Sequence, residues 1–534
     1  MFKLLYLKLQ RHPQLGDLEI YFVEENEINN IDQPYTSVII GPNGSGKSYI
    51  LRTIIEIFRE FYQLKLKSVE RIQLSIDIHL KYKYDNDVYE IFTKRWASVN
   101  KNGGFRRDYI YLKNKPNDVS LYDNRIKGRI SFEKKTGYEI DIKDLKFPSK
   151  ILASSVFLND RFPFANSQEN DFYQYLGVRR TPSMASTKTF ARNTVKYLYE
   201  ASFSRRGFNN YLQAILNFLE FENHLTITYL TRYNNIFFNG DLTEETLKSF
   251  YEKWWNLKEQ GVNRSKDNAP WGEYHYQYLL KNDPARLRAI VDFLNKSSRD
   301  EHIIQHKPRS RSKQFVVDLI KFDFNRLDLS IIEDLDKLSI LTLDEINLLK
   351  KETEISVEET SSGEYHLILN FLGVFAKIEH NSLILIDEPE ISLHPNWQMK
   401  YVTFLKSIFS LYNCHFIICT HSHFLISDLE GKSSSVVALD RISNTGVIVA
   451  KLLNRNTYAW SAEEVLLKVF KVPTTRNYFI ADKVGEILEL VSKSIRDDDL
   501  IRNKVRELVD NNIQNLSTED PLKPVINRLL EKYA

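Results

Sequence analysis

An eight-residue segment, GPNGSGKS from Gly41 to Ser48, constrains the fold of this chain more than any other feature. It fits the phosphate-binding loop pattern, in which glycines let successive backbone N–H groups turn inward around nucleotide phosphates. Lys47 is expected to reach the β and γ phosphates of ATP, and Ser48 to coordinate Mg²⁺ through its hydroxyl. The residues predicted to bind the nucleotide are Gly41, Pro42, Asn43, Gly44, Ser45, Gly46, Lys47 and Ser48.

The sequence on either side of this loop supports the same interpretation. The apolar run TSVII precedes it and predicts a buried strand, whereas Ile50, Ile54 and Phe58 follow it at helical spacing. A strand, a glycine loop and a helix therefore come in the order that phosphate binding at a helix N-terminus requires. A chance glycine turn is the alternative, and it leaves this order unexplained.

Two acidic residues follow a second apolar strand, in the segment SLILIDEPE. Both Asp387 and Glu388 are expected to emerge at the end of that strand. We assign Asp387 to Mg²⁺, through water, and Glu388 to polarising the attacking water as general base. The alternative is that this pair caps the next helix.

A third strand, FIICT, leads to His421. If parallel strands carry their last residues to the same edge of a sheet, His421 could contact the γ-phosphate and the attacking water. A lone histidine in such a place is more often structural. Its position after Asp387 and Glu388 favours the catalytic assignment.

The segment TSSGEYHLI is a small polar loop that opens a helix and precedes Asp387 by 24 residues, counted from Gly363. By itself it is explained equally well by a helix N-cap, because hydroxyls and an acid satisfy free amides at a helix start. The residues concerned are Ser361, Ser362, Gly363 and Glu364.

The remaining pattern predicts an α/β head domain that a long insertion divides. Alternating stretches over about residues 70–145 favour an antiparallel sheet, residues 165–345 show helical spacing, and the segments from about 350 alternate helix and strand as in a parallel α/β core. We therefore expect four regions: 1–164, the first part of the head; 165–345, a mainly helical insertion or arm; 346–454, the second part of the head; and 455–534, a helical C-terminal region in which Ile480, Val484, Ile487, Leu488 and Val491 share one face.

Taken in order, the four motifs resemble the ABC-ATPase heads of the SMC, RecF and overcoming-lysogenization-defect (OLD) families, over about residues 1–160 and 350–450. In such heads the signature loop of one subunit covers the ATP held by another. The resemblance therefore implies dimerisation, with Ser361, Ser362, Gly363 and Glu364 as trans contacts. The signature departs from LSGG(Q/E), with Thr360 in place of leucine and Ser362 in place of the first glycine.

The same families carry a metal-sensing loop residue, usually glutamine, after the strand that leads to the insertion. Asn159 occupies about that place, and Asn159 or its neighbour Asp160 is the candidate. A turn residue is the alternative at both positions. In DEPEISLHP, Glu390 lies in the segment that family members use across the dimer, so we expect it near the partner subunit.

Three further segments resemble the Septu-type (PtuA) anti-phage defence ATPases, which occur with a partner nuclease or in retron systems. They are HPQLGDLEIYF, FYQYLGVRR and SAEEVLLKVFKVPTTRN. The resemblance implies a PtuB-like HNH nuclease as partner, regulated through nucleotide binding, and ATP turnover that is slow if ATP is a sensed ligand.

The motifs also bear on three other classes of protein. A transporter subunit would place signature and phosphate loop closer than the 313 positions between Ser48 and Ser361. OLD nucleases add a metal-binding Toprim domain, for which Glu430 and Asp497 to Asp499 offer no convincing equivalent, so we expect no nuclease activity in the isolated chain. A RecF-like or SMC-like DNA repair ATPase is the stronger alternative.

Composition limits the partners. With 73 Lys and Arg against 70 Asp and Glu, the net charge of +3 does not by itself indicate nucleic acid, so any contact with DNA or retron nucleic acid must use local patches. Lys307–Lys313 is the main candidate; the others, which could equally be solvated loops, are Arg179–Arg180, Arg205–Arg206 and Arg106–Arg107. Two cysteines, no apolar run of membrane-spanning length and no leader cleavage site predict a reducing, cytoplasmic location without a membrane partner.

Overall fold

The computed structural model forms two units, Met1–Asn456 and Thr457–Ala534, which are described separately below. The structure describes residues 1–28, 34–67, 69, 71–99, 105–114, 137–157, 160–164, 172–177, 179–181, 184–185, 187–204, 207–259, 272–306, 313–320, 324–427, 429–430, 432–442, 445–453, 462–468, 478–492, 497–511, 513, 516, 520 and 522–533.

A seven-stranded sheet is the centre of the first unit, with the strand order β20-β19-β3-β18-β17-β8-β9. All neighbouring strands run parallel except β19 and β20. The middle strands are buried along their whole length, as apolar strands covered on both faces should be. The bounds are β3 Tyr35–Ile40, β8 Ile151–Ser155, β9 Tyr173–Tyr175, β17 Leu383–Asp387, β18 His415–Thr420, β19 Ser434–Arg441 and β20 Ile448–Leu452.

A six-stranded antiparallel sheet, of order β2-β1-β4-β5-β6-β7, lies beside it. The antiparallel sheet expected after residue 70 is confirmed, and the hairpin of β1 and β2 joins it because β1 pairs with β4. The bounds are β1 Lys3–His12, β2 Gly16–Tyr21, β4 Asp77–Tyr84, β5 Asp87–Val99, β6 Phe105–Asn114 and β7 Tyr138–Glu139, with short 3-10 turns η1 Glu25–Glu27 and η3 Ile142–Asp144.

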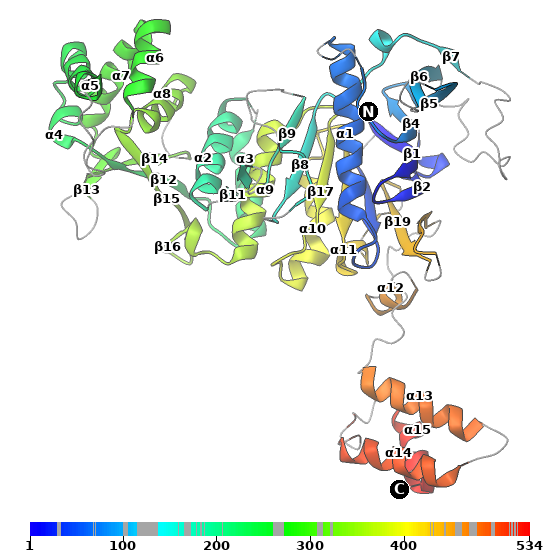
Figure 1. The fold of residues 1–534 in the computed structure, drawn as a ribbon. Coiled ribbons are helices and arrows are strands. Elements are labelled where there is room, and N and C mark those ends of the chain that lie inside the picture. The colour runs from blue at the N-terminus through cyan, green and yellow to red at the C-terminus, as the bar shows by residue number, and fades with distance from the viewer. Residues whose placement is uncertain are drawn as a thin grey trace. The chain divides into compact units, whose positions relative to one another are not determined.

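Helix α1 (Lys47–Lys65) fills the space between the two sheets, as Figure 1 shows. Its apolar residues are buried on more than one side because it meets both sheets. The ring of Phe58 packs 5.9 Å from that of Phe2 on the antiparallel side. This burial anchors the helix that begins at the phosphate loop.

Helices cover the other face of the parallel sheet. Phe218 of α3 stacks on Phe404 of α10 with ring centroids 3.7 Å apart, and Tyr211 of α3 lies 4.5 Å from Phe375 of α9. Both α9 and α10 lie in the region from about residue 350 that is expected to alternate helix and strand, and both pack against α3. The bounds are α2 Thr187–Ser204, α3 Phe208–Phe218, α9 Ser362–Lys377, α10 Pro395–Ile408 and α11 Phe424–Ser427, and the two-stranded sheet is β10 Arg179–Thr181 with β11 Met184–Ala185.

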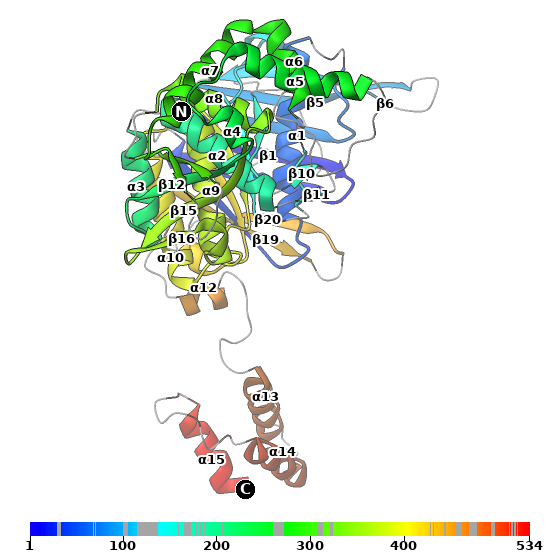
Figure 2. The same ribbon diagram turned by 90° about the vertical axis from the view of Figure 1, so that its left-hand side faces the viewer.

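The expected insertion, 165–345, contains more than helices. Residues 225–356, called the arm from here on, combine the expected helices with a five-stranded antiparallel sheet that helical spacing did not predict. Its strand order is β13-β14-β12-β15-β16. In Figure 1 it lies on the side of the first unit away from β1 and β2, and in Figure 2 this side faces the viewer. The bounds are β12 Leu225–Thr231, α4 Asn234–Phe237, α5 Glu244–Glu259, α6 Glu273–Asn282, α7 Pro284–Ser298, β13 Ile304–His306, β14 Lys313–Asp318, α8 Arg326–Lys337, β15 Leu341–Lys350, β16 Thr353–Ser356 and η4 Val357–Glu359.

The second unit is helical, as predicted, and its three longer helices share a small apolar core that includes Val484, Ile487 and Val505. One residue differs from expectation, because Leu488 is 44% exposed and does not belong to the core face. The bounds are α12 Ala462–Lys468, α13 Tyr478–Ser492, α14 Asp498–Asp510 and α15 Lys523–Tyr533.

Both cysteines are buried and free, with Cys419 within β18 and Cys414 directly before it. None of the helices in the described part of the chain is long and apolar enough to cross a membrane.

Candidate functional site

Four parallel strands bring the sequence motifs to one edge of the sheet. Ile40, the last residue of β3, pairs with Thr420, the last residue of β18, and Asp387 of β17 pairs with both Cys419 and Ser155. The carboxyl ends of neighbouring parallel strands form the usual ligand-binding edge of an α/β sheet. The phosphate loop, Asp387, Glu388 and His421 therefore share this edge.

Glycine is required at two positions of the loop for different reasons. Gly46 has a φ of 88°, and a side chain there would place a Cβ 2.3 Å from Cδ2 of Leu15, in the turn between β1 and β2. Gly41 is pressed against β19, where a Cβ would come 2.9 Å from the carbonyl oxygen of Leu439. The loop therefore lies tightly between the hairpin and the sheet, with α1 starting at Lys47.

Lys47 is buried, with 5% of the residue exposed, and its Nζ donates to the carbonyl oxygen of Gly41 at 3.0 Å. The same Nζ lies 2.7 Å from Nε2 of His421. Burial lowers the pKa of Lys47, while the neighbouring acidic side chains, Glu388 and Asp387 among them, oppose that shift. A partly desolvated cation is thereby fixed where the loop turns.

Asp387 is 3% exposed and hydrogen-bonds with the hydroxyl of Ser48. Burial raises the pKa of Asp387 to about 7, and the negative charge of Glu388 adds to the effect. Its Oδ1 is buried and has no hydrogen-bond partner within the described part of the chain. A buried carboxylate oxygen without a partner, beside a serine hydroxyl, suits a hard cation with oxygen ligands such as Mg²⁺.

Glu388 has a left-handed backbone, with a φ of 49°, which is uncommon for a residue with a side chain. Its N–H donates to the carbonyl oxygen of Cys419 at 2.8 Å, and its Oε1 lies 3.4 Å from Nε2 of His421. This backbone turn directs the carboxylate toward the loop residues. Strained residues of this kind cluster at functional sites.

The acidic pair does not cap the following helix. Helix α10 begins at Pro395, and its N-cap is His394, whose Nδ1 accepts from the N–H of Asn396 at 3.3 Å. The capping alternative for Asp387 and Glu388 is therefore wrong.

At the signature loop, the N-cap interpretation is correct as local structure. Ser361 and Glu364 form a capping box, in which the Ser361 hydroxyl accepts from the N–H of Glu364 and the Glu364 carboxylate accepts from the N–H of Ser361 at 2.9 Å. Ser361 and Ser362 remain exposed, whereas Glu364 is buried. Gly363 faces its own chain, because a Cβ there would lie 2.3 Å from the carbonyl oxygen of Ser392.

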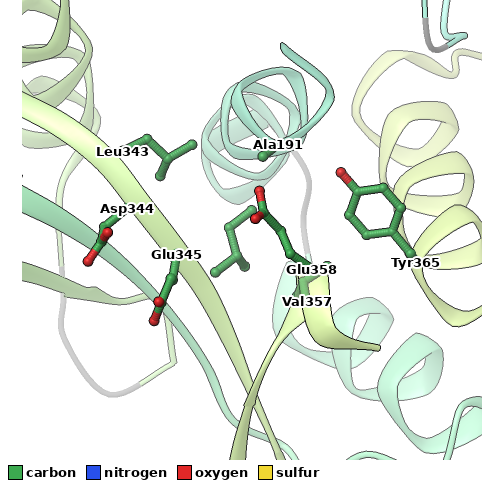
Figure 3. Close-up of a pocket in the computed structure, with 8 residues that line it drawn as sticks. Ala191, Leu343, Asp344, Glu345, Val357, Glu358 and Tyr365 are labelled. Carbon is green, nitrogen blue, oxygen red and sulfur yellow. The ribbon is translucent and has the colours of Figure 1, made fainter. Parts of the chain in front are cut away.

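The signature helix α9 is also tied to the arm. Lys350, the last residue of β15, donates to Oε1 of Glu364 at 2.8 Å. Burial alone would raise the pKa of Glu364, but the hydrogen bonds from Lys350 and Ser361 hold it below its usual range. Figure 3 shows a small pocket at this junction, where Glu358 and Tyr365 lie across from β15 residues 343–345.

Of the two candidates for the metal-sensing residue, Asn159 lies outside the described residues. Asp160 is described, and it is no simple turn residue, because its buried carboxylate pairs with Arg179, 2.5 Å from Nη2, and accepts from the Tyr175 hydroxyl at 2.5 Å. Burial raises the pKa of Asp160, and the bonds from Tyr175 and Arg179 oppose that shift. Arg179 is therefore ion-paired with Asp160 inside the protein. This corrects the assignment of Arg179 to a DNA-binding patch.

Most residues of the other candidate nucleic-acid-binding patches lie outside the described residues. Residues 307–312 and 205–206 lie outside the described residues, and Arg106 and Arg107 are described only as part of strand β6.

Glu390, which is expected near a partner subunit, also makes a contact within its own chain. Its Oε1 accepts from the backbone N–H of His421 at 2.6 Å, inside the same chain. Sequence spacing alone gives no signal for this contact, because the two residues follow different strands.

The tail acids have ordinary structural surroundings. Asp497 caps α14 by accepting from the N–H of Leu500, and Asp498 and Asp499 lie in the first turn of that helix. Over the part of the chain that the structure describes, no group of three or more His, Cys, Asp or Glu residues is arranged to hold a metal ion.

Comparisons with known proteins agree with this geometry. A family model described as "AAA ATPase domain" matches residues 17–426. The chain is 23% identical over 419 residues to the Retron Vc95 probable ATPase of Vibrio cholerae serotype O1 biovar El Tor, covering 75% of this chain and 68% of that protein. It is 29% identical over 148 residues to the Septu protein PtuA of Bacillus thuringiensis, covering 25% of this chain and 36% of that protein.

Among solved structures, the SMC head domain from Thermotoga maritima matches with 11% identity and a TM-score of 0.34, over 85% of this chain and 100% of that one.

Proposed function

The chain belongs to the AAA ATPase domain family, and we propose that it is the ATP-hydrolysing subunit of an anti-phage defence system. In this proposal, nucleotide-dependent dimerisation of the subunit regulates a partner nuclease. Relatives named as a retron ATPase and as a Septu protein support the defence role.

The observation that carries the ATPase proposal is the meeting of Lys47, His421 and the Ser48–Asp387 pair at one sheet edge. The loop amides and Lys47 bind the triphosphate, since backbone N–H groups at a helix start attract anions. Ser48 and Asp387 would hold Mg²⁺, which neutralises phosphate charge when bound. Glu388 orients the attacking water and accepts its proton, and His421 contacts the γ-phosphate.

We propose that the signature acts across a dimer. Ser361 and Ser362 are exposed at the N-terminus of α9, a helix of 16 residues. The N–H groups at this helix start offer positive charge to a phosphate held by a second subunit. Glu364 is buried and accepts a hydrogen bond from Lys350, so its proposed role is to shape the turn. The groups proposed to contact the ATP of the second subunit are Ser361, Ser362 and the N–H of Gly363.

The partner proposed is an HNH nuclease of the PtuB-like kind, in a cytoplasmic complex in which DNA or retron nucleic acid is a further candidate ligand. The chain itself is proposed to lack nuclease activity and to turn over ATP slowly. The arm would couple nucleotide binding to the nuclease, because Lys350 of β15 forms an ion pair with Glu364 of the signature helix α9.

Phosphate release by the purified chain tests the ATPase proposal. We expect release that requires both Mg²⁺ and Glu388, and no cutting of added DNA. Absence of any turnover above the Glu388→Gln background, under all Mg²⁺ concentrations, would contradict it.

Copurification with the products of adjacent genes tests the defence proposal. A nuclease that elutes with the chain supports it. DNA-stimulated ATP turnover with no such partner would favour the repair ATPase instead.

A further inference from the structure

Glu390 lies in the segment between β17 and α10, and its side chain turns toward the active edge of the sheet. Its Oε1 accepts from the backbone N–H of His421 at 2.6 Å. Burial raises the pKa of Glu390, and the bond from the His421 amide opposes this shift. The carboxylate is therefore used inside the chain.

The hydrogen bond to Glu390 holds the backbone of His421, which the sheet does not fix. His421 follows Thr420, the last residue of β18, so sheet pairing no longer fixes its peptide. Its ring lies between two reactive groups, with Nε2 at 2.7 Å from Nζ of Lys47 and 3.4 Å from Oε1 of Glu388. A hydrogen bond to a carboxylate is shorter and stronger than one between neutral groups, so Glu390 is well suited to fix this peptide.

A second contact fixes the residue after His421. Ser422 donates through its hydroxyl to Oε1 of Gln398 at 2.6 Å. Gln398 in turn donates through Nε2 to the carbonyl oxygen of Leu393 at 2.9 Å and, more weakly, to that of Glu390 at 3.4 Å. Glu390 and Gln398, which lies in α10, thus hold the chain at His421 and at Ser422.

We propose that Glu390 is a positioning residue for ATP hydrolysis, which acts by holding the His421 peptide so that the imidazole stays between Lys47 and Glu388. This inference rests on the proposed ATPase function and deepens it. Glu390 does not itself touch the reacting atoms.

Three substitutions of Glu390 test whether it positions His421 or only fills space in the protein. Glu390→Ala removes the acceptor, Glu390→Asp keeps the charge and shortens its reach, and Glu390→Gln keeps a carbonyl oxygen at the same length. The matched control is Glu379→Ala, which removes a carboxylate paired with Lys150 before the amino end of β17, away from the active edge.

Because a hydrogen-bond donor aimed at the charge that develops in the transition state contributes about 100-fold or more to rate, loss of the positioning of His421 in Glu390→Ala or Glu390→Asp is expected to lower kcat by about 10-fold or more. The KM for ATP should change by less than about 3-fold, since ground-state binding is left in place. Glu390→Gln and Glu379→Ala should retain most of the wild-type kcat.

A double-mutant comparison gives the sharper test. In a His421→Ala background, Glu390→Ala should lower kcat no further, because its effect passes through the imidazole. Additive losses in the double variant, an equally low kcat in Glu390→Gln, or wild-type kcat in Glu390→Ala would each overturn the inference.

NMR of histidine-labelled protein supplies a readout that does not need turnover. The ring signal of His421, assigned from His421→Ala, should shift in Glu390→Ala and stay in place in Glu390→Gln and Glu379→Ala. If wild-type protein released no phosphate, the proposed function would fail by itself. Whether or not phosphate is released, an unmoved His421 signal in Glu390→Ala and Glu390→Asp would overturn the inference that Glu390 positions His421.

Discussion

Nζ of Lys47 lies 2.7 Å from Nε2 of His421, although 374 positions separate the two residues in the chain. The contact exists because β3 and β18 are neighbours in a parallel sheet and end at the same edge. The arm is inserted in the sequence between β3 and β18, and the two strands still pair along the sheet. The chemistry of the site therefore depends on strand order.

Loss of the lysine side chain is expected to remove nucleotide binding. Lys47→Ala deletes charged hydrogen bonds to phosphate, so the affinity for ATP should fall by roughly 100-fold or more. Lys65→Ala, at the other end of the same helix, is the control and should bind as wild type does. Calorimetry measures both, and undiminished ATP binding by Lys47→Ala would refute the assignment.

Proton binding by Asp387 should make stability depend on pH. Because its pKa is raised from 3.8 to about 7, the folded protein without Mg²⁺ holds this proton more tightly than the unfolded chain does. Its contribution to stability is present below pH 4 and is lost as the pH rises through about 7. Asp387→Asn should therefore raise the free energy of unfolding at pH 8 by about 1 to 4 kcal/mol.

Urea unfolding in EDTA at pH 5 and pH 8 measures this difference. The gain in Asp387→Asn should shrink at pH 5, where the wild-type carboxyl is largely protonated. A variant less stable than wild type at pH 8 would contradict the burial of an ionising group here.

Binding of Mg²⁺ and nucleotide should release a proton at pH 6, because the metal requires the Asp387 carboxylate. Calorimetry in two buffers of different ionisation enthalpy counts that proton. Equal heats in both buffers would show that Asp387 is already ionised.

Arg179 should be a large contributor to stability. Arg179→Ala leaves the fully buried Asp160 side chain without its cation, which typically costs about 3 to 5 kcal/mol. Arg52→Ala, which breaks the exposed pair with Glu56, is the matched control and should cost less than about 1 kcal/mol. Denaturant unfolding compares them, and similar small losses for both would contradict the described pairing.

Much of the head could be predicted from sequence because its signals are local. The strand TSVII, the glycine loop and helix α1 are contiguous, and the order of strand ends at Asp387 and His421 follows from apolar runs. These elements lie where the sequence places them.

The arm sheet was missed because its pairing is long-range. Leu225 of β12 pairs with Leu348 of β15, and the short alternating strands stand among longer helical segments. Local periodicity therefore favoured helix throughout. The bond of Glu390 to His421 and that of Asp160 to Arg179 were unpredictable for the same reason, since each joins residues whose separation in sequence carries no pattern.

Closure of a dimer around ATP can be measured on Glu388→Gln with ATP and Mg²⁺, from the mass by light scattering and from the nucleotide content after gel filtration. Loss of the general base should leave binding intact and stop turnover, so we expect a stable dimer that retains two ATP molecules. Wild-type protein with ADP should elute as the smaller species. A Glu388→Gln variant that remains a monomer with ATP, binds no ATP, or hydrolyses it at the wild-type rate would refute ATP-dependent dimerisation at this site.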